Sequence, residues 1–444
     1  MAIDPNHVID LNEGQFDGTS AADLTAMFTQ IAATPTTTPL VVHFHGGLVD
    51  EASGEQIALR LQAVYEAAGA YPVFFVWHAG LLEVLQDHWQ SILSDTVFNR
   101  LLGLISHFLL SYSSADTSTV GAGTGTGPGL RLDSVQAELG VANAGHVPFA
   151  AVDTSGVSFA GLDYTLLRVA VLAEAAIGAV SAALSAASLA PVDVAETAVA
   201  VAIRVVERFE SGRDHGLYAT IVEELVRDWP LGADIQKLWA DMKGETASAF
   251  SVGDTYGGTA FLKGLMAELT ARPGRKVVLV GHSTGAVYIC NLLNNLPADW
   301  PAAACFEVIF LAAACTYELF ASTIAQPAIA ARVSSLHAFG MQDEVEQADQ
   351  VLPPLYLRSL LYFVSGICEP QSDTPIVGMQ RFLTLPALNN DPSVSAVRAY
   401  LNGQSLVWSV ADGAPGCSSH AIHHGDFTTD PTTLASVQYL IGAP

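Results

Sequence analysis

A chain of 444 residues in which half are hydrophobic and 14% are charged has a globular composition, which excludes a disordered protein. Its formal net charge of −26 repels nucleic acid and anionic membrane surfaces, and therefore favours neutral or apolar substrates. The first residues form no basic, apolar leader and the five cysteines are widely spread, so neither a secretory signal nor a disulfide framework is visible. We expect a cytoplasmic protein with reduced thiols; secretion after removal of a signal is the alternative.

The first elements along the chain predict a parallel sheet. Residues 39–45 and 71–77 are apolar runs rich in β-branched or aromatic residues, and each run ends in glycine or histidine. Between them, residues 55–68 carry apolar side chains at helical spacing. A strand, a helix and a strand with short connections are typical of a parallel sheet, whose strands are buried on both faces.

The pattern changes between residues 81 and 249. Residues 113–130 are rich in serine, threonine and glycine and predict a loop; because no strand leads into them, their glycines do not form a dinucleotide-binding fingerprint. Residues 165–210 are rich in alanine and valine, and the stretch 175–192 has no charge. Its small side chains, and Pro191 at its end, favour a buried helix or hairpin over a membrane span. A lid that touches lipid reversibly is a further alternative.

The most informative motif lies at residues 276–288. An apolar run leads into Gly281-His282-Ser283-Thr284-Gly285, and a helix-compatible segment follows. This order is typical of a nucleophile elbow, where small residues on either side allow a sharp turn that presents the serine above the sheet edge. We predict that Ser283 is a nucleophile; an ordinary strand-to-helix turn that uses glycine is the alternative.

Three more strands are predicted after this motif, over residues 307–312, 333–339 and 405–410, with a last helix over residues 432–441. A serine nucleophile needs a base, and the base needs an acid that orients it. Asp343 is the first acid after the second of these strands, so we expect it to be the acid, with Glu318 as the alternative. The acids that follow Asp343 are expected to form a solvated helix start.

For the base, three histidines follow the strand at 405–410. We favour His424, because the adjacent Gly425 leaves it a free path to the sheet edge, over His423 and then His420. All three could instead be polar loop residues. Their spacing matches no metal-ligand signature, so we predict no metal here.

The reaction also needs backbone N–H donors for an oxyanion. Thr284, which follows the nucleophile, should supply one, and Gly46 or Gly47 in the loop after residues 39–45 should supply the other. We expect His45 to hold that loop by local hydrogen bonds, and His282 to form a wall of the acyl pocket.

His43 and His45 have a spacing seen at metal sites, but no Asp-His pair follows them to complete a binuclear set. We therefore predict no metal at this pair either.

With these motifs in this order, the chain resembles the α/β-hydrolase superfamily of serine esterases and lipases over residues 35–80 and 255–444. The resemblance implies an α/β-hydrolase fold with a mostly parallel sheet of about eight strands flanked by helices, no cofactor, and an acyl-enzyme on Ser283. The catalytic core would comprise residues 1–80 and 250–444. A large, mainly helical insertion at 81–249 would precede the nucleophile strand, whereas caps in this superfamily often follow the sixth strand.

The expected activity is hydrolysis of neutral or apolar carboxylic esters, either small molecules or lipid-like, by a base that works near neutral pH. The same residues could carry out acyl transfer or hydrolyse thioesters or amides. A binding protein that kept the fold and lost the reaction is the alternative from a different class.

Overall fold

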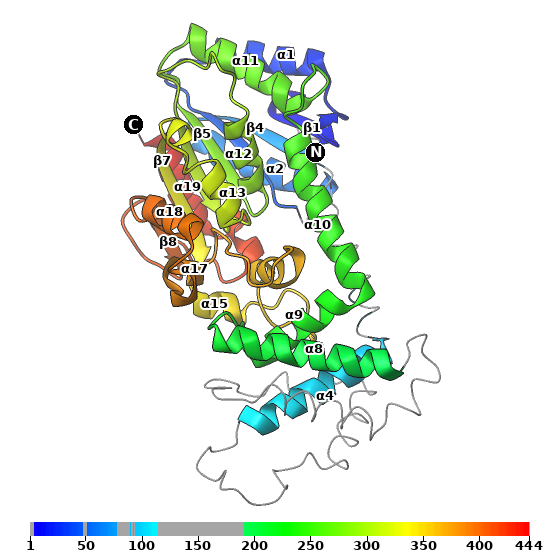
Figure 1. Ribbon diagram of the computed structural model, residues 1–444. Coiled ribbons are helices and arrows are strands. Elements are labelled where there is room, and N and C mark those ends of the chain that lie inside the picture. Colours follow the sequence, from blue (N-terminus) through cyan, green and yellow to red (C-terminus); the bar gives the residue numbers. More distant parts are fainter. Residues whose placement is uncertain are drawn as a thin grey trace, which may run out of the picture.

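One eight-stranded sheet organises the computed structural model, which describes residues 4–47, 51–77, 89, 92, 94–113 and 191–443 (Figure 1). The strand order is β2-β1-β4-β3-β5-β6-β7-β8, and every neighbouring pair is parallel except the β1–β2 hairpin. The expectation of an α/β protein with a mostly parallel sheet of about eight strands is therefore confirmed. The strands are β1 (Val8–Asn12), β2 (Gln15–Phe16), β3 (Leu40–Phe44), β4 (Tyr71–Trp77), β5 (Val277–His282), β6 (Phe306–Leu311), β7 (Val333–Met341) and β8 (Ser405–Ser409).

Helices cover both faces of the sheet, because alternate strand residues point to opposite sides. In β3, for example, Leu40, Val42 and Phe44 belong to one buried cluster and Val41 to the other. The first cluster includes side chains of α1 (Ala21–Ala33), α11 (Gly257–Ala271), α12 (Gly285–Asn294), α13 (Tyr317–Ser322) and α18 (Pro392–Leu401). The second includes side chains of α2 (Glu51–Ala67) and α19 (Pro431–Gly442).

The strands predicted from the sequence are present, with ends within two residues of the expected ones, but the β1–β2 hairpin was not predicted. Its strand β1 contains Asp10, a residue that is rare in strands. The side chain of Asp10 is buried and accepts a hydrogen bond from the Gly18 backbone N–H at 3.0 Å. A local partner therefore satisfies the carboxylate, and this compensation cannot be read from the strand alone.

The described part of residues 81–249 is helical, with α4 (Thr96–Ser113), α8 (Pro191–Glu210), α9 (Leu217–Asp228) and α10 (Pro230–Ser248). Pro191 is the first residue of α8, a position that proline favours, and the run that it was predicted to close lies outside the described residues. The predicted loop at 113–130 and residues 165–190 lie almost entirely outside the described residues. Within the described ranges, the helices are too short or too polar to cross a membrane.

A second group of short helices follows β7, in the segment between β7 and β8. It includes α15 (Asp343–Ala348), α16 (Leu360–Phe363), a π-helical segment η4 (Val364–Cys368) and α17 (Arg381–Thr384). The helix α9 packs against η4, so the inserted helices meet this later segment. Figure 1 shows α10 running from the layer of α8 and α9 up along the sheet. The remaining short elements are α14 (Pro327–Ala330), η1 (Pro5–His7), η5 (Pro386–Leu388) and η6 (His424–Thr428).

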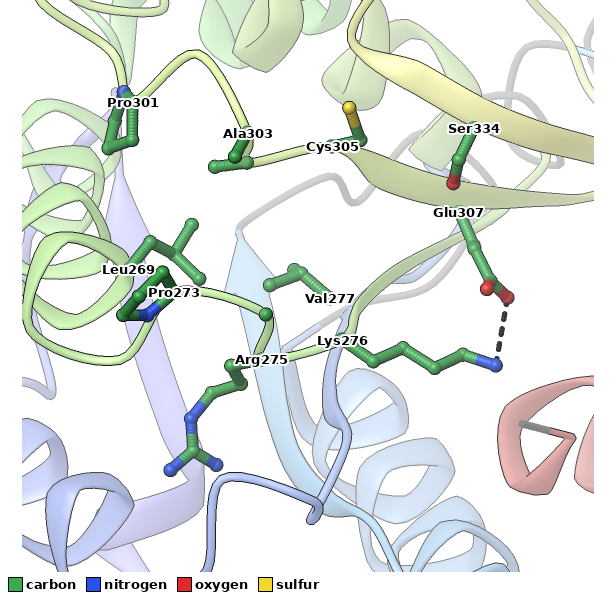
Figure 2. A pocket seen from close by; sticks show the side chains of 12 residues that line it. Leu269, Pro273, Arg275, Lys276, Val277, Pro301, Ala303, Cys305, Glu307 and Ser334 are labelled. Carbon is green, nitrogen blue, oxygen red and sulfur yellow. Dashed lines mark ion pairs between the residues drawn. The ribbon is translucent and has the colours of Figure 1, made fainter.

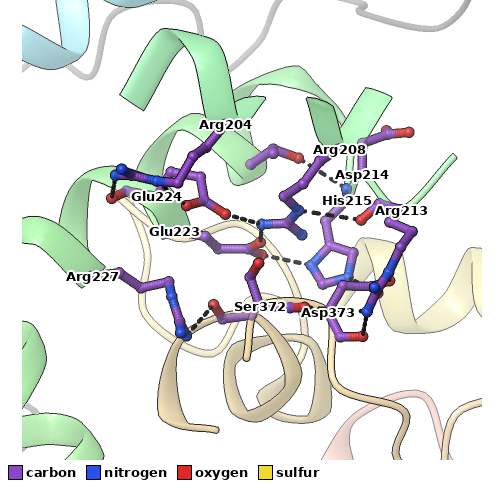
Figure 3. A network of polar contacts seen from close by, with 12 residues as sticks. Arg204, Arg208, Arg213, Asp214, His215, Glu223, Glu224, Arg227, Ser372 and Asp373 are labelled. Carbon is purple, nitrogen blue, oxygen red and sulfur yellow. Dashed lines mark hydrogen bonds and ion pairs between the residues drawn. The ribbon is translucent and has the colours of Figure 1, made fainter. Parts of the chain in front are cut away.

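A buried network of charges joins these two groups of helices (Figure 3). His215, between α8 and α9, lies between two carboxylates: Nδ1 is 2.8 Å from Glu223 and Nε2 is 2.9 Å from Asp373. Arg208 pairs with Glu223 at 2.7 Å, and Arg213 pairs with Asp373 at 2.9 Å. Burial alone would raise the pKa of Glu223, but the neighbouring His215 and Arg208 lower it to about 2. The inserted helices are thus held to the later segment by charge complementarity.

We predict that Asp373→Ala lowers the free energy of unfolding by about 3–5 kcal/mol, because the buried His215 loses one of its two carboxylate partners and the half-buried Arg213 loses its ion pair. Urea denaturation of the full chain measures this loss. The matched control is Lys237→Ala, which breaks a pair with Asp241 whose lysine side chain is 73% exposed and should cost less than about 1 kcal/mol. Equal losses in the two variants would contradict a structural role for the buried network.

Candidate active site

Ser283 lies in a sharp turn between β5 and α12, with a left-handed backbone at φ +55°. Residues other than glycine rarely adopt this conformation, which costs free energy unless the surrounding structure holds it. Two hydrogen bonds to the chain at the end of β6 do so. The Ser283 N–H donates to Leu311 O at 2.8 Å, and the Ala314 N–H donates to Ser283 O at 2.9 Å.

The two glycines of the motif allow the close contacts that this turn requires. A Cβ on Gly285 would lie 2.1 Å from the Phe44 carbonyl oxygen, so the first residue of α12 touches the end of β3. A Cβ on Gly281 would lie 2.7 Å from the backbone of Gly285. Since real Cβ atoms do not approach backbone atoms this closely, only glycine fits at either position.

The loop after β3 lies against the turn that carries Ser283. A Cβ on Gly46 would be 3.1 Å from the Ser283 Cβ, and one on Gly47 would be 2.9 Å from Thr284 Oγ1. Among the described residues, no hydrogen bond takes up the backbone N–H of Gly46, Gly47 or Thr284. The structure therefore places the three predicted oxyanion donors close to one another, with N–H groups that no described residue takes up.

His45 connects the loop of Gly46 and Gly47 to the neighbouring strand β4. The Trp77 N–H donates to His45 Nε2 at 3.2 Å, so the ring proton is on Nδ1, which donates to Gly46 O at 2.7 Å. The imidazole also stacks on the Trp77 ring, with centroids 5.4 Å apart. Burial lowers the pKa of His45 to about 4, so this histidine is neutral and holds the loop by hydrogen bonding.

His282 and His424 lie next to each other beside the turn. Their ring centroids are 5.1 Å apart, and His282 Nε2 donates to the His424 carbonyl at 3.1 Å. His424 is only 8% exposed, yet neither ring nitrogen has a hydrogen-bond partner among the described residues. Burial lowers the pKa of His424 well below its usual value, with a further contribution from His282. A neutral imidazole with free nitrogens can accept a proton.

The two predicted acids and the third histidine lie elsewhere. Asp343 begins α15, where its carboxylate accepts hydrogen bonds from Tyr362 Oη at 2.7 Å and from Gln347 at 2.8 Å. No hydrogen bond between described residues joins Asp343 to His424. The alternative acid, Glu318, is exposed in the first turn of α13, and His420 is exposed and 2.8 Å from Asp412.

Asp349, which the sequence analysis did not single out, is the acid that contacts the histidine loop. One of its carboxylate oxygens lies 2.8 Å from His423 Nδ1, and the other accepts the His424 backbone N–H at 3.1 Å. The hydrogen bond with Asp349 raises the pKa of His423, whose side chain is 61% exposed. The only sequence signal was the position of Asp349 directly after the acidic helix α15.

Glu346 corrects the expectation that the acids after Asp343 are solvated. Its side chain is fully buried on α15, and Ser359 Oγ donates to one carboxylate oxygen. Burial raises the pKa of Glu346 to about 8, and the nearby Asp349 and Asp343 add to the shift. The prediction of a solvated helix start is therefore wrong for this residue, because α15 turns one acidic face into the protein.

The described residues include no group of three or more histidine, cysteine, aspartate or glutamate side chains that could hold a metal ion. His43, predicted as part of an H-x-H pair, is buried with Nδ1 2.9 Å from Tyr65 Oη. Its contact is thus with a tyrosine on α2.

A cavity of about 290 Å³ lies at the opposite edge of the sheet from Ser283 (Figure 2). Its walls come from the amino ends of β5, β6 and β7, and they include Lys276 and Glu307, which form an ion pair at 3.0 Å. Ser283 follows the carboxyl end of β5, so this cavity does not open onto the candidate site.

Comparison of the chain with models of known protein families, with curated proteins and with solved structures found no match. A functional conclusion therefore depends on the turn at Ser283, on the loop of Gly46 and Gly47, and on the histidines beside them.

Proposed function

We propose that the protein is a serine hydrolase with an α/β-hydrolase fold that cleaves carboxylic esters of neutral or apolar acyl groups. The observation that carries the proposal is the left-handed backbone of Ser283. On either side of it, Gly281 and Gly285 are packed so closely that neither position has room for a Cβ. Backbone strain of this kind clusters at active sites, where it presents a reactive group and where stabilising contacts in the rest of the fold offset its free-energy cost. An ordinary strand-to-helix turn would not need it.

The position of Ser283 in the sheet supports this proposal. The strand β5 is central, with β3 on one side and β6 on the other, and all three are parallel. Ligands of open parallel sheets bind beyond the carboxyl ends of the strands, where the connecting loops meet. The turn at Ser283, the loop after β3 and the chain after β6 all meet at that edge.

The proposed reaction uses these groups together with His424, which lies beside His282. His424 accepts the hydroxyl proton as Ser283 Oγ attacks the ester carbonyl, and the oxyanion that forms is held by N–H groups of Thr284 and of Gly47 or Gly46. His424 then gives its proton to the leaving alcohol, which leaves an acyl group on Ser283. Water, activated by His424 in the same way, releases the acid and restores the serine.

The proposed role of Asp349 is to position the base. Its two carboxylate oxygens contact the His423 ring and the His424 backbone, so it fixes the loop from which the His424 ring extends. Among the described residues beside Ser283, burial keeps His45, His282 and His424 neutral. A neutral ester is the substrate that such a site accepts without desolvating an unpaired charge.

We expect Ser283→Ala to lower turnover of p-nitrophenyl esters, from acetate to palmitate, by about 10³-fold or more, because no other group can form the acyl-enzyme. Labelling by a fluorophosphonate should disappear in the same variant. The matched control is Ser334→Ala in the cavity at the opposite edge, which should change neither readout. If the wild type neither labels nor turns over any ester, the fold serves binding instead; labelling without ester turnover points to a thioester, an amide or an acyl acceptor.

The pH dependence identifies the base. Because the pKa of His424 is lowered, it stays unprotonated as the pH falls through 6.5, so kcat/KM should remain constant there and decline only in more acidic solution. If His423 were the base instead, its raised pKa would make kcat/KM fall already above pH 6.5. His424→Gln should abolish turnover and His423→Gln should retain most of it. The reverse pattern would make His423 the base.

The two acids can be separated by matched substitutions. Asp349→Asn should lower kcat by about 10²-fold, because the loop of His424 loses its anchor and a small displacement of a reacting group costs this much. Asp343→Asn should have a much smaller effect, since its carboxylate contacts Tyr362 and Gln347. A larger loss in Asp343→Asn would restore Asp343 as the acid.

A further inference from the structure

Among the described residues of the inserted region, Met242 on α10 lies against the candidate site. A Cβ on Gly47 would lie 2.1 Å from Met242 Sδ and 2.8 Å from its terminal methyl group, and 2.9 Å from Thr284 Oγ1. The thioether therefore packs directly on Gly47, near the point where the loop after β3 meets Thr284. Both of these residues are proposed oxyanion donors.

Contacts along α10 hold Met242 in this place. On the C-terminal side of Met242, Glu245 accepts a hydrogen bond from the backbone N–H of Glu13 at 3.1 Å, and Thr246 Oγ1 accepts one from Asn291 of α12 at 2.9 Å. On the N-terminal side of Met242, Trp239 Nε1 donates a hydrogen bond to Glu369 at 2.6 Å. The helix is thus tied to the β1–β2 hairpin, to the helix that follows the nucleophile and to the segment after β7. A side chain on such a helix forms a fixed wall.

Gly47 and Met242 also depend on each other. The missing side chain at Gly47 leaves the space that the thioether occupies, and Met242 is only 5% exposed. An unbranched methionine fills irregular gaps well, and shortening or widening it changes the free space in a graded way. An acyl group whose carbonyl oxygen binds the N–H groups of Gly47 and Thr284 would begin its chain near this side chain.

We propose that Met242 determines acyl specificity: it bounds the space that receives the acyl chain and restricts the enzyme to short chains. This inference rests on the proposed function, since it takes the oxyanion position from it. It also assigns a role to the inserted region, which supplies one wall of the pocket from α10 while the sheet supplies the nucleophile and the donors.

The test is the ratio of kcat/KM for p-nitrophenyl octanoate to that for p-nitrophenyl acetate. A ratio is independent of the fraction of folded enzyme, so a partly destabilised variant still gives a valid result. Met242→Ala should raise the ratio by about tenfold or more, the scale of one methylene group in an apolar pocket. Met242→Leu should leave the ratio nearly unchanged, and Met242→Phe should lower it. The phenylalanine variant therefore tests the inference independently if the alanine variant fails to fold.

Met266→Ala is the matched control, because Met266 lies on α11, is half-buried and packs on the core that includes Phe261. Its ratio should equal that of the wild type. An unchanged ratio in both Met242→Ala and Met242→Phe, in enzyme that still labels with a fluorophosphonate, would overturn the inference alone. Failure of the wild type to label or to hydrolyse either ester would overturn the proposed function and, with it, this inference.

Discussion

The candidate site depends on how closely the turn after β5 approaches the end of β3. The two strands are parallel neighbours, with Phe44 opposite Gly281 in register. Because Gly285 has no side chain, the first turn of α12 can touch the Phe44 carbonyl. That contact places Ser283 and Thr284 beside the loop of Gly46 and Gly47, although the two segments are far apart in the sequence. A Cβ at Gly285 would clash with the Phe44 carbonyl and push the turn at Ser283 away from the end of β3.

Two electrostatic environments follow from burial in different parts of the molecule. Beside Ser283, burial keeps the rings of His282 and His424 neutral and able to accept a proton. Between α9 and the segment after β7, the buried groups are charged, and each charge has an opposite partner. The two histidine rings beside Ser283 are therefore neutral, whereas the helices α8 and α9 are held to the segment after β7 by ion pairs.

Local patterns predicted most of the strands of the sheet. A short apolar run that ends at glycine or histidine is typical of a buried strand and of few other structures. The turn at Ser283 was predicted because its motif is local, although the contact that requires Gly285 is with Phe44 of the distant strand β3. The histidine loop was predicted to reach the sheet edge, and the structure places His424 beside His282 there. The β1–β2 hairpin was missed because a neighbouring residue satisfies the buried Asp10.

By itself, the sequence determined most of the strands and the position of the turn at Ser283, since each is marked by a pattern within a few consecutive residues. Only the tertiary structure decided which carboxylate reaches the histidine loop. Asp343 and Asp349 lie at opposite ends of α15, and the direction of that short helix turns Asp349 toward His423 and His424. The contact of Met242 with Gly47 likewise depends on where α10 packs. Contacts between distant segments are set by the packing of whole elements, which no local pattern specifies.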